Sequence, residues 1–166
     1  MIALLRDGFH PQSEGGSIEL AGDGTPIIDY VINDYLWDGV RRSWLSMAEI
    51  QFAAGAKAVR ASHVDSPWFT SWEEAKAGIN ALEFRSNAFT AGSAHCMGGL
   101  TMGEDQTRCL VDSNGKYHHL DNLYVFDGSV FPTSIGANPQ LSIYGNVNRL
   151  AQGLAKRLSG KDVLLA

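Results

Sequence analysis

The chain has 166 residues, of which 45% are hydrophobic and 19% are charged, and its formal net charge at pH 7 is −5. This composition is typical of a globular protein with one core, and the few, scattered basic residues argue against nucleic-acid binding. No apolar run is long enough to cross a bilayer, and residues 1–10 lack the apolar segment of a secretory signal.

The N-terminal part of the chain predicts two strands. Residues 1–14 favour a surface segment or a loose strand. Residues 15–20 alternate apolar and polar side chains, as a half-buried strand does, and residues 27–31 are a second candidate strand. Glycine, aspartate and proline in residues 21–26 predict a turn between them.

A helix is predicted over residues 38–54, where apolar residues recur at helical spacing. Asp38 is expected to cap its start, and Gly55 to end it. Residues 58–62 are a candidate strand after this helix.

A second helix is predicted over residues 71–83. Thr70 is followed three residues later by Glu73, which is the spacing of a capping box. Gly78 lowers the helix propensity of this segment.

The next segments predict loops, a hairpin and a strand. Residues 93–103, SAHCMGGLTMG, have the character of a loop. Residues 111–117 predict a hairpin around an Asn-Gly pair. Residues 123–126 are apolar and favour β-structure, so we expect a buried strand that ends at residues 127–129.

A long helix is predicted to follow, with Asn138 as N-cap, Pro139 at the first helical position and Gly160 as its stop. Its apolar face is formed by Ile143, Tyr144, Val147, Leu150, Ala151, Leu154, Ala155 and Leu158. The helix N-terminus would thus point at a polar loop just past a strand, which favours binding of an anion or an electron-rich ring.

Three segments together resemble the C-terminal signature of the glucose–methanol–choline (GMC) oxidoreductases, which are flavoenzymes that oxidise alcohols. They are residues 95–99 (HCMGG), 122–129 (NLYVFDGS) and 136–139 (GANP). The match in residue type, order and spacing covers about residues 93–158. Residues 15–59 resemble the family more loosely.

The resemblance implies an α+β fold in two incomplete parts. Residues 1–92 would be part of a substrate-binding domain built on an antiparallel sheet, and residues 93–166 the C-terminal part of an α/β FAD-binding domain. Family members are several times longer, and their FAD-binding region opens with a Gly-x-Gly-x-x-Gly turn that this sequence lacks. We therefore expect the C-terminal part of a longer enzyme, or a truncated gene product, whose partner is the missing N-terminal part.

The resemblance also implies FAD as cofactor, an alcohol as substrate, and oxygen, a quinone or another carrier as electron acceptor. His95 would take the hydroxyl proton while hydride passes to flavin N5, because an imidazole titrates near neutral pH. The alternative is a loop histidine that is only hydrogen-bonded. The amide of Asn138 would donate a hydrogen bond to the substrate oxygen, in addition to capping the helix.

By the same resemblance, Asp127, Gly128, Asn138, Pro139 and Gln140 would contact the cofactor. For Asp127 we favour this role over the alternative of a turn residue and nothing more, whereas for Gln140 a purely structural role is at least as well supported.

No metal site is expected. His118 and His119 are neighbours, and neighbouring side chains on a strand point to opposite faces. Cys96 and Cys109 have neither metal-type nor redox-type spacing, so a reduced, cytoplasmic setting is the default, although one disulfide is also compatible. Two non-enzymatic interpretations stay open: a truncated relic that binds nothing, and an interaction module that uses this half-fold as a surface.

Overall fold

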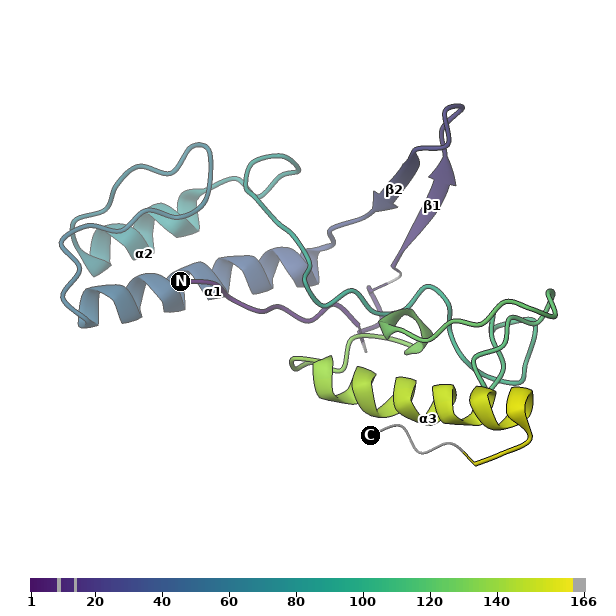
Figure 1. Ribbon diagram of the computed structural model, residues 1–166. Helices are drawn as coiled ribbons and strands as arrows, with labels where there is room; N and C mark the ends of the chain where they lie inside the picture. Colours follow the sequence, from purple (N-terminus) through teal and green to yellow (C-terminus); the bar gives the residue numbers. More distant parts are fainter. Residues whose placement is uncertain (9, 14, 163–166) are drawn as a thin grey trace. The chain divides into compact units, whose positions relative to one another are not determined.

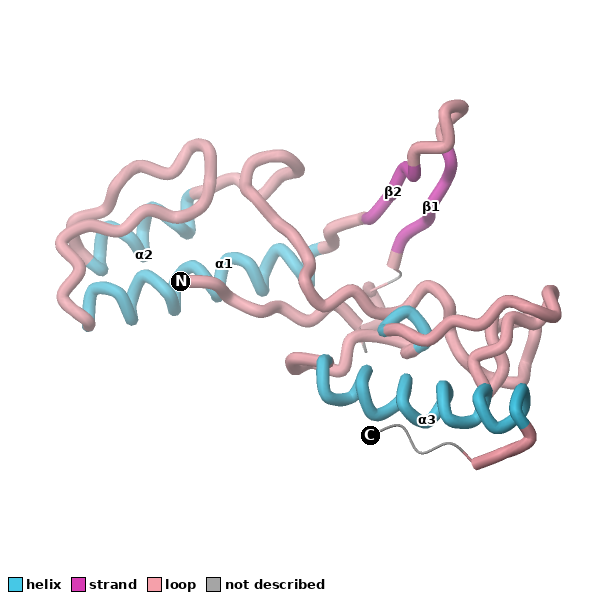
Figure 2. Tube along the Cα trace, viewed as in Figure 1, coloured by secondary structure: helices cyan, strands magenta, loops and turns pink. Residues whose placement is uncertain are grey.

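The computed structural model describes residues 1–8, 10–13 and 15–162 (Figure 1, Figure 2). The chain divides into two compact units, residues 1–92 and 93–166. Three α-helices and one antiparallel strand pair make up the described regular structure together with a short 3-10 helix, which is consistent with the predicted α+β class. The assignment of the units to a substrate domain and a flavin domain stays a prediction.

The first unit begins with a two-stranded antiparallel hairpin, β1 (Gly16–Leu20) and β2 (Pro26–Tyr30). Both predicted strands are confirmed, with bounds that differ by one residue at one or both ends, but β1 is exposed along its whole length and is not half-buried. The predicted turn is confirmed as well: the side chain of Asp23 accepts a hydrogen bond from the backbone N–H of Thr25 at 2.9 Å. The described residues before β1 form no strand, which favours the surface segment over the loose strand.

Helix α1 (Asp34–Ala53) begins four residues before the predicted start. Its N-cap is Asn33, whose side chain accepts a hydrogen bond from Leu36 N at 3.0 Å. Asp38 is therefore not the cap. It lies inside the helix and forms an i,i+4 ion pair with Arg42 at 2.8 Å. Gly55 ends the helical segment as predicted, in a left-handed conformation with φ +90°.

Helix α2 (Trp72–Ala81) is shorter than predicted, and its cap lies one residue further along. Ser71 accepts a hydrogen bond from Glu74 N at 3.2 Å. Glu74 reaches back and accepts hydrogen bonds from Thr70 N and Oγ1, each at 2.9 Å, and these bonds lower the pKa of Glu74. The predicted pairing of Thr70 with Glu73 is wrong, because Ser71 is the residue with extended cap geometry.

The core of this unit lies between α1 and α2, which pack on each other. Its buried members are Val40, Trp44, Ala48, Val59, Ala61, Phe69, Ala75 and Ile79. The candidate strand at 58–62 is wrong: only Val59 forms a bridge, with Phe69, through hydrogen bonds of 2.8 and 2.9 Å. His63 is buried here and its Nε2 lies 2.9 Å from Glu83 O, so it has a structural role.

The second unit contains the predicted hairpin around Asn114 and Gly115. Asp112 Oδ1 accepts hydrogen bonds from Asn114 N at 2.8 Å and from Lys116 N at 2.9 Å, and Gly115 has φ +73°. Residues 123–126 do not form the predicted buried strand. They run beside this hairpin with a single bridge, and Leu123 is 41% exposed.

Helix α3 (Gln140–Ser159) follows a 3-10 turn, η1 (Gly128–Val130). Its N-cap position is Pro139, and no side chain caps its first turn, so the prediction that Asn138 is the cap is wrong. The stop is confirmed: Gly160 is left-handed with φ +69°, and its N–H bonds Lys156 O at 2.8 Å. None of the helices formed by the described residues is both long and apolar enough to cross a membrane.

Candidate functional site

The loop after His95 lies against η1 through backbone hydrogen bonds. The N–H groups of Gly98, Leu100 and Met102 donate to the carbonyl oxygens of residues 128, 129 and 130, at 3.4, 3.1 and 3.1 Å. The donors are alternate residues of the loop, and the acceptors are the three successive residues of η1. Two of the three signature segments, at residues 95–99 and 122–129, are therefore in direct contact.

Gly128 is the point where this loop meets helix α3. The residue is buried, and a Cβ placed there would lie 2.8 Å from Cys96 O and 3.1 Å from Ile143 Cδ1. The absence of a side chain therefore lets the loop, η1 and the first turns of α3 approach closely. Gly128 has a packing role in this structure, and its predicted cofactor contact stays a prediction.

His95 is half-buried, and its imidazole ring has no hydrogen-bond partner among the described residues. Its backbone N–H donates to Ser93 Oγ at 3.3 Å. Within the described part of the chain, no hydrogen bond or ion pair involves the ring. The role of His95 as the base therefore stays a prediction, beside the alternative of a loop histidine that is only hydrogen-bonded.

The two glycines behind His95 give the loop an open backbone. Gly98 and Gly99 both have left-handed conformations, with φ +83° and +95°. A Cβ at Gly99 would meet nothing within 4 Å, so open space lies beside the main chain at this point. A flat group could approach the backbone closely there.

The start of α3 offers unshared donors. A helix leaves its first N–H groups without intrahelical partners, and they carry the positive end of the helix dipole. No side chain caps them in α3. Pro139 is buried and accepts a hydrogen bond from Ile143 N at 2.8 Å, whereas Asn138 and Gln140 are exposed. These exposed groups and free donors are suited to an anion or a polar ring edge.

Asp127 caps η1. Its Oδ1 accepts a hydrogen bond from Ser129 N at 2.8 Å and a second one from Ser129 Oγ. This is the turn role that the sequence left open for Asp127. Among the described residues no hydrogen bond reaches its Oδ2, so a second role toward a ligand is compatible with the turn.

The structure brings the signature segments together without joining every predicted site residue. Asp127, Gly128 and the loop after His95 are in contact, and Ile143 links α3 to them. In the described residues, no hydrogen bond joins His95 to Asn138. A small apolar hollow adjoins this region, lined by Met102, Val130, Phe131, Pro132, Ser142 and Asn146.

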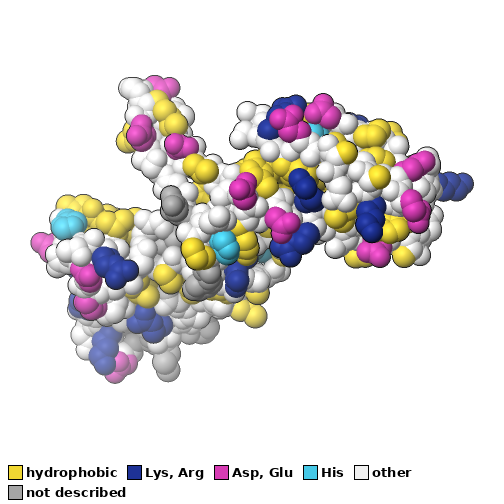
Figure 3. Space-filling view, turned by 180° about the vertical axis from the view of Figure 1, so that it is seen from behind, with side chains coloured by type: hydrophobic (Ala, Val, Ile, Leu, Met, Phe, Trp, Pro, Cys, Tyr) yellow, Lys and Arg dark blue, Asp and Glu magenta, His cyan; other side chains and the backbone are white. Residues whose placement is uncertain are grey.

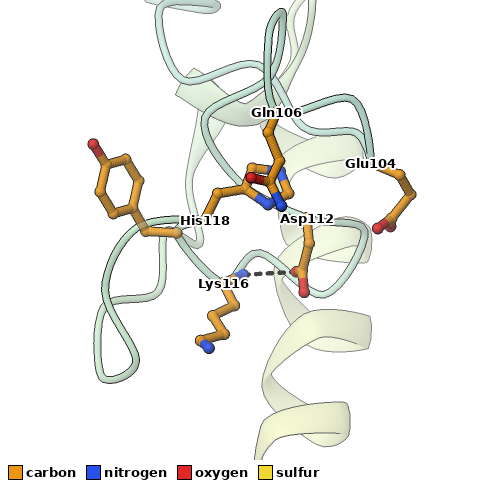
Figure 4. A pocket seen from close by; sticks show the side chains of 6 residues that line it. Glu104, Gln106, Asp112, Lys116 and His118 are labelled. Carbon is orange, nitrogen blue, oxygen red and sulfur yellow. Dashed lines mark hydrogen bonds between the residues drawn. The ribbon is translucent and has the colours of Figure 1, made fainter.

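Sequence reasoning missed a polar hollow in the second unit (Figure 4). It is lined by Glu104, Gln106, Asp112, Lys116, Tyr117 and His118. His118 Nε2 lies 2.9 Å from Gly103 O, and hydrogen bonding from Ser113 lowers the pKa of Glu104. These residues carry no motif spacing, and no set of three or more His, Cys, Asp or Glu side chains in the described residues could hold a metal ion.

Comparisons with known proteins identify similar sequences. The GMC oxidoreductase family model matches residues 11–146. The chain is 37% identical to 6'''-hydroxyparomomycin C oxidase of Streptomyces lividus, over 50% of this chain and 15% of that protein. It is 29% identical to an uncharacterized GMC-type oxidoreductase of Sinorhizobium fredii, over 87% of this chain and 28% of that protein. It is 24% identical to a long-chain-alcohol oxidase of Arabidopsis thaliana, over 96% of this chain and 22% of that protein. The chain spans less than a third of the length of each of these relatives.

Proposed function

The chain belongs to the GMC oxidoreductase family, and on this basis we propose that it is the C-terminal part of a longer FAD-dependent enzyme that oxidises the CH–OH group of an alcohol. Relatives whose names describe oxidases, including a long-chain-alcohol oxidase, support this reaction class. Their greater length supports a missing N-terminal part as the partner of this chain. Oxygen, a quinone or another carrier would then accept the electrons, and the setting would be cytoplasmic.

One observation carries the proposal: separate signature segments meet in space. The loop that follows His95 is hydrogen-bonded to η1, which Asp127 caps, and Gly128 lets both pack on α3. The loop after His95, η1 and α3 thus lie around one region, although they come from separate parts of the sequence. Such convergence of polar groups and open backbone is typical of a ligand site.

The residues present fit FAD. The uncapped start of α3 provides N–H donors and a positive dipole end for the electron-rich pyrimidine edge of a flavin. The open backbone at Gly99 leaves room for a flat ring, and Asp127 Oδ2 is an acceptor for its polar part. Gly128, Pro139 and Gln140 would complete these contacts. When bound, FAD supplies the hydride acceptor at N5.

Two side chains would act on the alcohol. His95 would accept the hydroxyl proton on its imidazole, which has no competing hydrogen bond in the described structure. Asn138 would donate from its amide to the substrate oxygen. It is free to do so, because no side chain, including its own, caps α3. An amide cannot take the proton at neutral pH, so the proton falls to His95.

The test is His95→Ala in the complete enzyme. We expect kcat to fall by roughly 10²–10⁴-fold, the usual contribution of a positioned acid–base group, with little change in bound FAD. His119→Ala is the matched control, because His119 is an exposed histidine of the same unit, outside the site. Its kcat should match that of the unmodified enzyme.

The measurements are alcohol-dependent flavin reduction without oxygen and the ratio of flavin to protein absorbance. If His95→Ala keeps kcat within a few-fold of the unmodified value, another group is the base. If the unmodified enzyme binds FAD but no alcohol reduces it, the proposed reaction is wrong.

A further inference from the structure

Arg149 of helix α3 contacts three separate segments of the second unit through one nitrogen. Its Nη2 donates to Met102 Sδ at 4.0 Å, to Ser113 O at 3.2 Å and to Asn146 Oδ1 at 3.2 Å. Met102 lies in the loop after His95, Ser113 in the hairpin at residues 112–117, and Asn146 about one turn earlier on α3. The guanidinium thus connects the loop, the hairpin and the helix.

The contact between Arg149 and the loop has no equivalent elsewhere. Among the described residues, no other hydrogen bond joins residues 93–103 to α3, because the backbone N–H groups of the loop bond to η1 instead. Close packing holds α3 at Gly128, where Ile143 approaches. Arg149 lies beyond Ile143 on the same helix, roughly 9 Å further along its axis at 1.5 Å per residue. It therefore adds a second point of attachment, and two points fix the direction of the helix where one would allow a pivot.

Side-chain packing leaves a gap between the loop and α3 at this second point. The gap is the apolar hollow, which has a volume of about 240 Å³ and is lined by Met102, Val130, Phe131 and Pro132 from the loop, η1 and the residues after it, and by Ser142 and Asn146 from α3. Two of these lining residues, Met102 and Asn146, are partners of Arg149. Because apolar contact does not close the hollow, the guanidinium is the group that links the segments around it.

An exposed arginine can also belong to a basic surface that binds an anion. On the face shown in Figure 3, Lys and Arg side chains are interspersed with acidic ones and form no continuous basic patch. The partners of Arg149 are uncharged acceptors of this chain, and they engage the hydrogens of Nη2. These contacts favour a link inside the second unit over a site for an external anion.

We propose that Arg149 is a positioning residue for the oxidation of the alcohol. It acts through Met102: by holding the loop on α3, it fixes the place of His95 relative to the start of the helix. Asn138 and the uncapped N–H groups lie at that start. Arg149 itself takes no part in the chemistry. This inference rests on the proposed function, because the place of His95 matters for turnover only if His95 takes the substrate proton.

The test is Arg149→Ala in the complete enzyme, with the rate of flavin reduction by alcohol measured without oxygen. We expect kcat to fall by roughly ten-fold and by no more than about 10²-fold, the cost of misplacing a reacting group by about 1 Å. KM for the alcohol should change little, because a loss confined to kcat marks an interaction that matters only in the transition state.

Arg157→Ala is the matched control. Arg157 also ties α3 to the second unit, through a hydrogen bond to Tyr124 Oη at 3.1 Å, but none of its hydrogen bonds among the described residues reaches the loop. This variant loses an exposed arginine of the same helix and should keep the kcat of the unmodified enzyme.

Hydrogen exchange of the loop provides a readout that needs no substrate. The amides of Gly98, Leu100 and Met102 should exchange about ten-fold faster in Arg149→Ala than in Arg157→Ala, because the loop opens more often once its tie to α3 is lost. The amides of α2, in the other unit, should exchange equally in both variants.

Arg149→Lys is the second variant, and it also serves if Arg149→Ala does not fold. Its ammonium keeps the charge and can donate to some of the same acceptors, but it lacks the planar fork, so its rate should lie between those of Arg149→Ala and the unmodified enzyme. A rate equal to that of the unmodified enzyme would contradict the proposal.

Two other outcomes would overturn the role of Arg149. They are equal flavin reduction in Arg149→Ala and Arg157→Ala, and equal exchange of the loop amides in these two variants. An unmodified enzyme whose flavin no alcohol reduces would instead contradict the proposed function, and loop exchange would still decide whether Arg149 holds the loop.

Discussion

At the scale of single residues, Asn138 was predicted to have two roles: to cap α3 and to donate a hydrogen bond to the substrate. The structure shows that it does not cap the helix. Its position before Pro139 makes it a plausible cap by residue type. Pro139 instead holds the N-cap position, with φ −86° and ψ −4°, and its carbonyl accepts the bond from Ile143 N. The helix thus starts one residue later, and the Asn138 amide stays exposed. The cap role is thus wrong, and the role of Asn138 in the reaction stays a prediction.

Because Asn138 does not cap α3, replacing it in the complete enzyme should have little effect on stability. Asn138→Ala should change the free energy of unfolding by less than about 0.5 kcal/mol, because no cap hydrogen bond is lost. Ser71→Ala is the control, since Ser71 does cap α2, and it should cost about 1 kcal/mol. Urea melts of both variants give the comparison.

The same residue should matter for turnover. Asn138→Asp should slow anaerobic flavin reduction strongly, because a carboxylate cannot donate to the substrate oxygen. Asn138→His should retain more activity, because an imidazole can donate. If Asn138→Asp reduces its flavin as fast as the unmodified enzyme, Asn138 has no part in the reaction.

At the scale of elements, local patterns predicted the structure well and non-local ones did not. The β1–β2 pair, the Asn114-Gly115 hairpin and the stop at Gly160 depend on a few neighbouring residues, and all were correct. The segment at 123–126 was wrong, because apolar β-formers become a buried strand only when other strands flank them. Here Lys116 of a short hairpin is the bridging partner.

The predicted starts of the helices were wrong for a related reason. Several polar residues near each start can cap, and the backbone geometry selects one. Asn33 rather than Asp38 caps α1, and Ser71 rather than Thr70 caps α2. For the site, motif spacing identified the segments that meet around Gly128. Spacing alone could not reveal the polar hollow near His118, which arises from turns that bring unrelated positions together.

Gly78 illustrates a packing constraint that helix propensity does not include, and it gives a further prediction. Glycine weakens a helix by about 1 kcal/mol relative to alanine, so Gly78→Ala would be expected to stabilise α2. The Phe69 ring lies on this position, however, and a Cβ would be 2.2 Å from its Cε1. We expect Gly78→Ala to destabilise the first unit by about 1–3 kcal/mol, the usual cost of overpacking.

Gly39→Ala in α1 is the control for this prediction. A Cβ there would lie 3.7 Å from the Leu5 side chain, which is an ordinary contact. This variant should be stabilised by up to about 1 kcal/mol. Thermal or urea unfolding of both variants decides, and a Gly78→Ala protein as stable as Gly39→Ala would show that Phe69 moves aside freely.

At the scale of the whole molecule, the two units expose apolar surface in different places. In the first, both strands of the β1–β2 hairpin are exposed along their whole length, and Trp68 is 66% exposed. In the second, Leu141, Tyr144 and Leu158 of α3 are 83%, 61% and 79% exposed. A helix predicted to be amphipathic thus buries only part of its apolar face, with Leu150 as its one buried residue. Large exposed apolar areas mark surfaces that bind a protein, a membrane or a ligand, or that promote aggregation.

The last prediction concerns this chain expressed alone. In the proposed site, the start of α3 and the loop after His95 would form only one side, and the sequence contains no Gly-x-Gly-x-x-Gly turn to hold the pyrophosphate. We therefore expect the purified 166-residue chain to show no flavin absorbance after incubation with FAD and gel filtration. It should bind a hydrophobic dye and self-associate as its concentration rises, because its apolar faces are open. The complete enzyme, treated in the same way, is the control and should retain FAD without dye binding. A yellow, monomeric 166-residue protein would mean that these residues suffice to hold the cofactor, and that the missing part is not needed for the site.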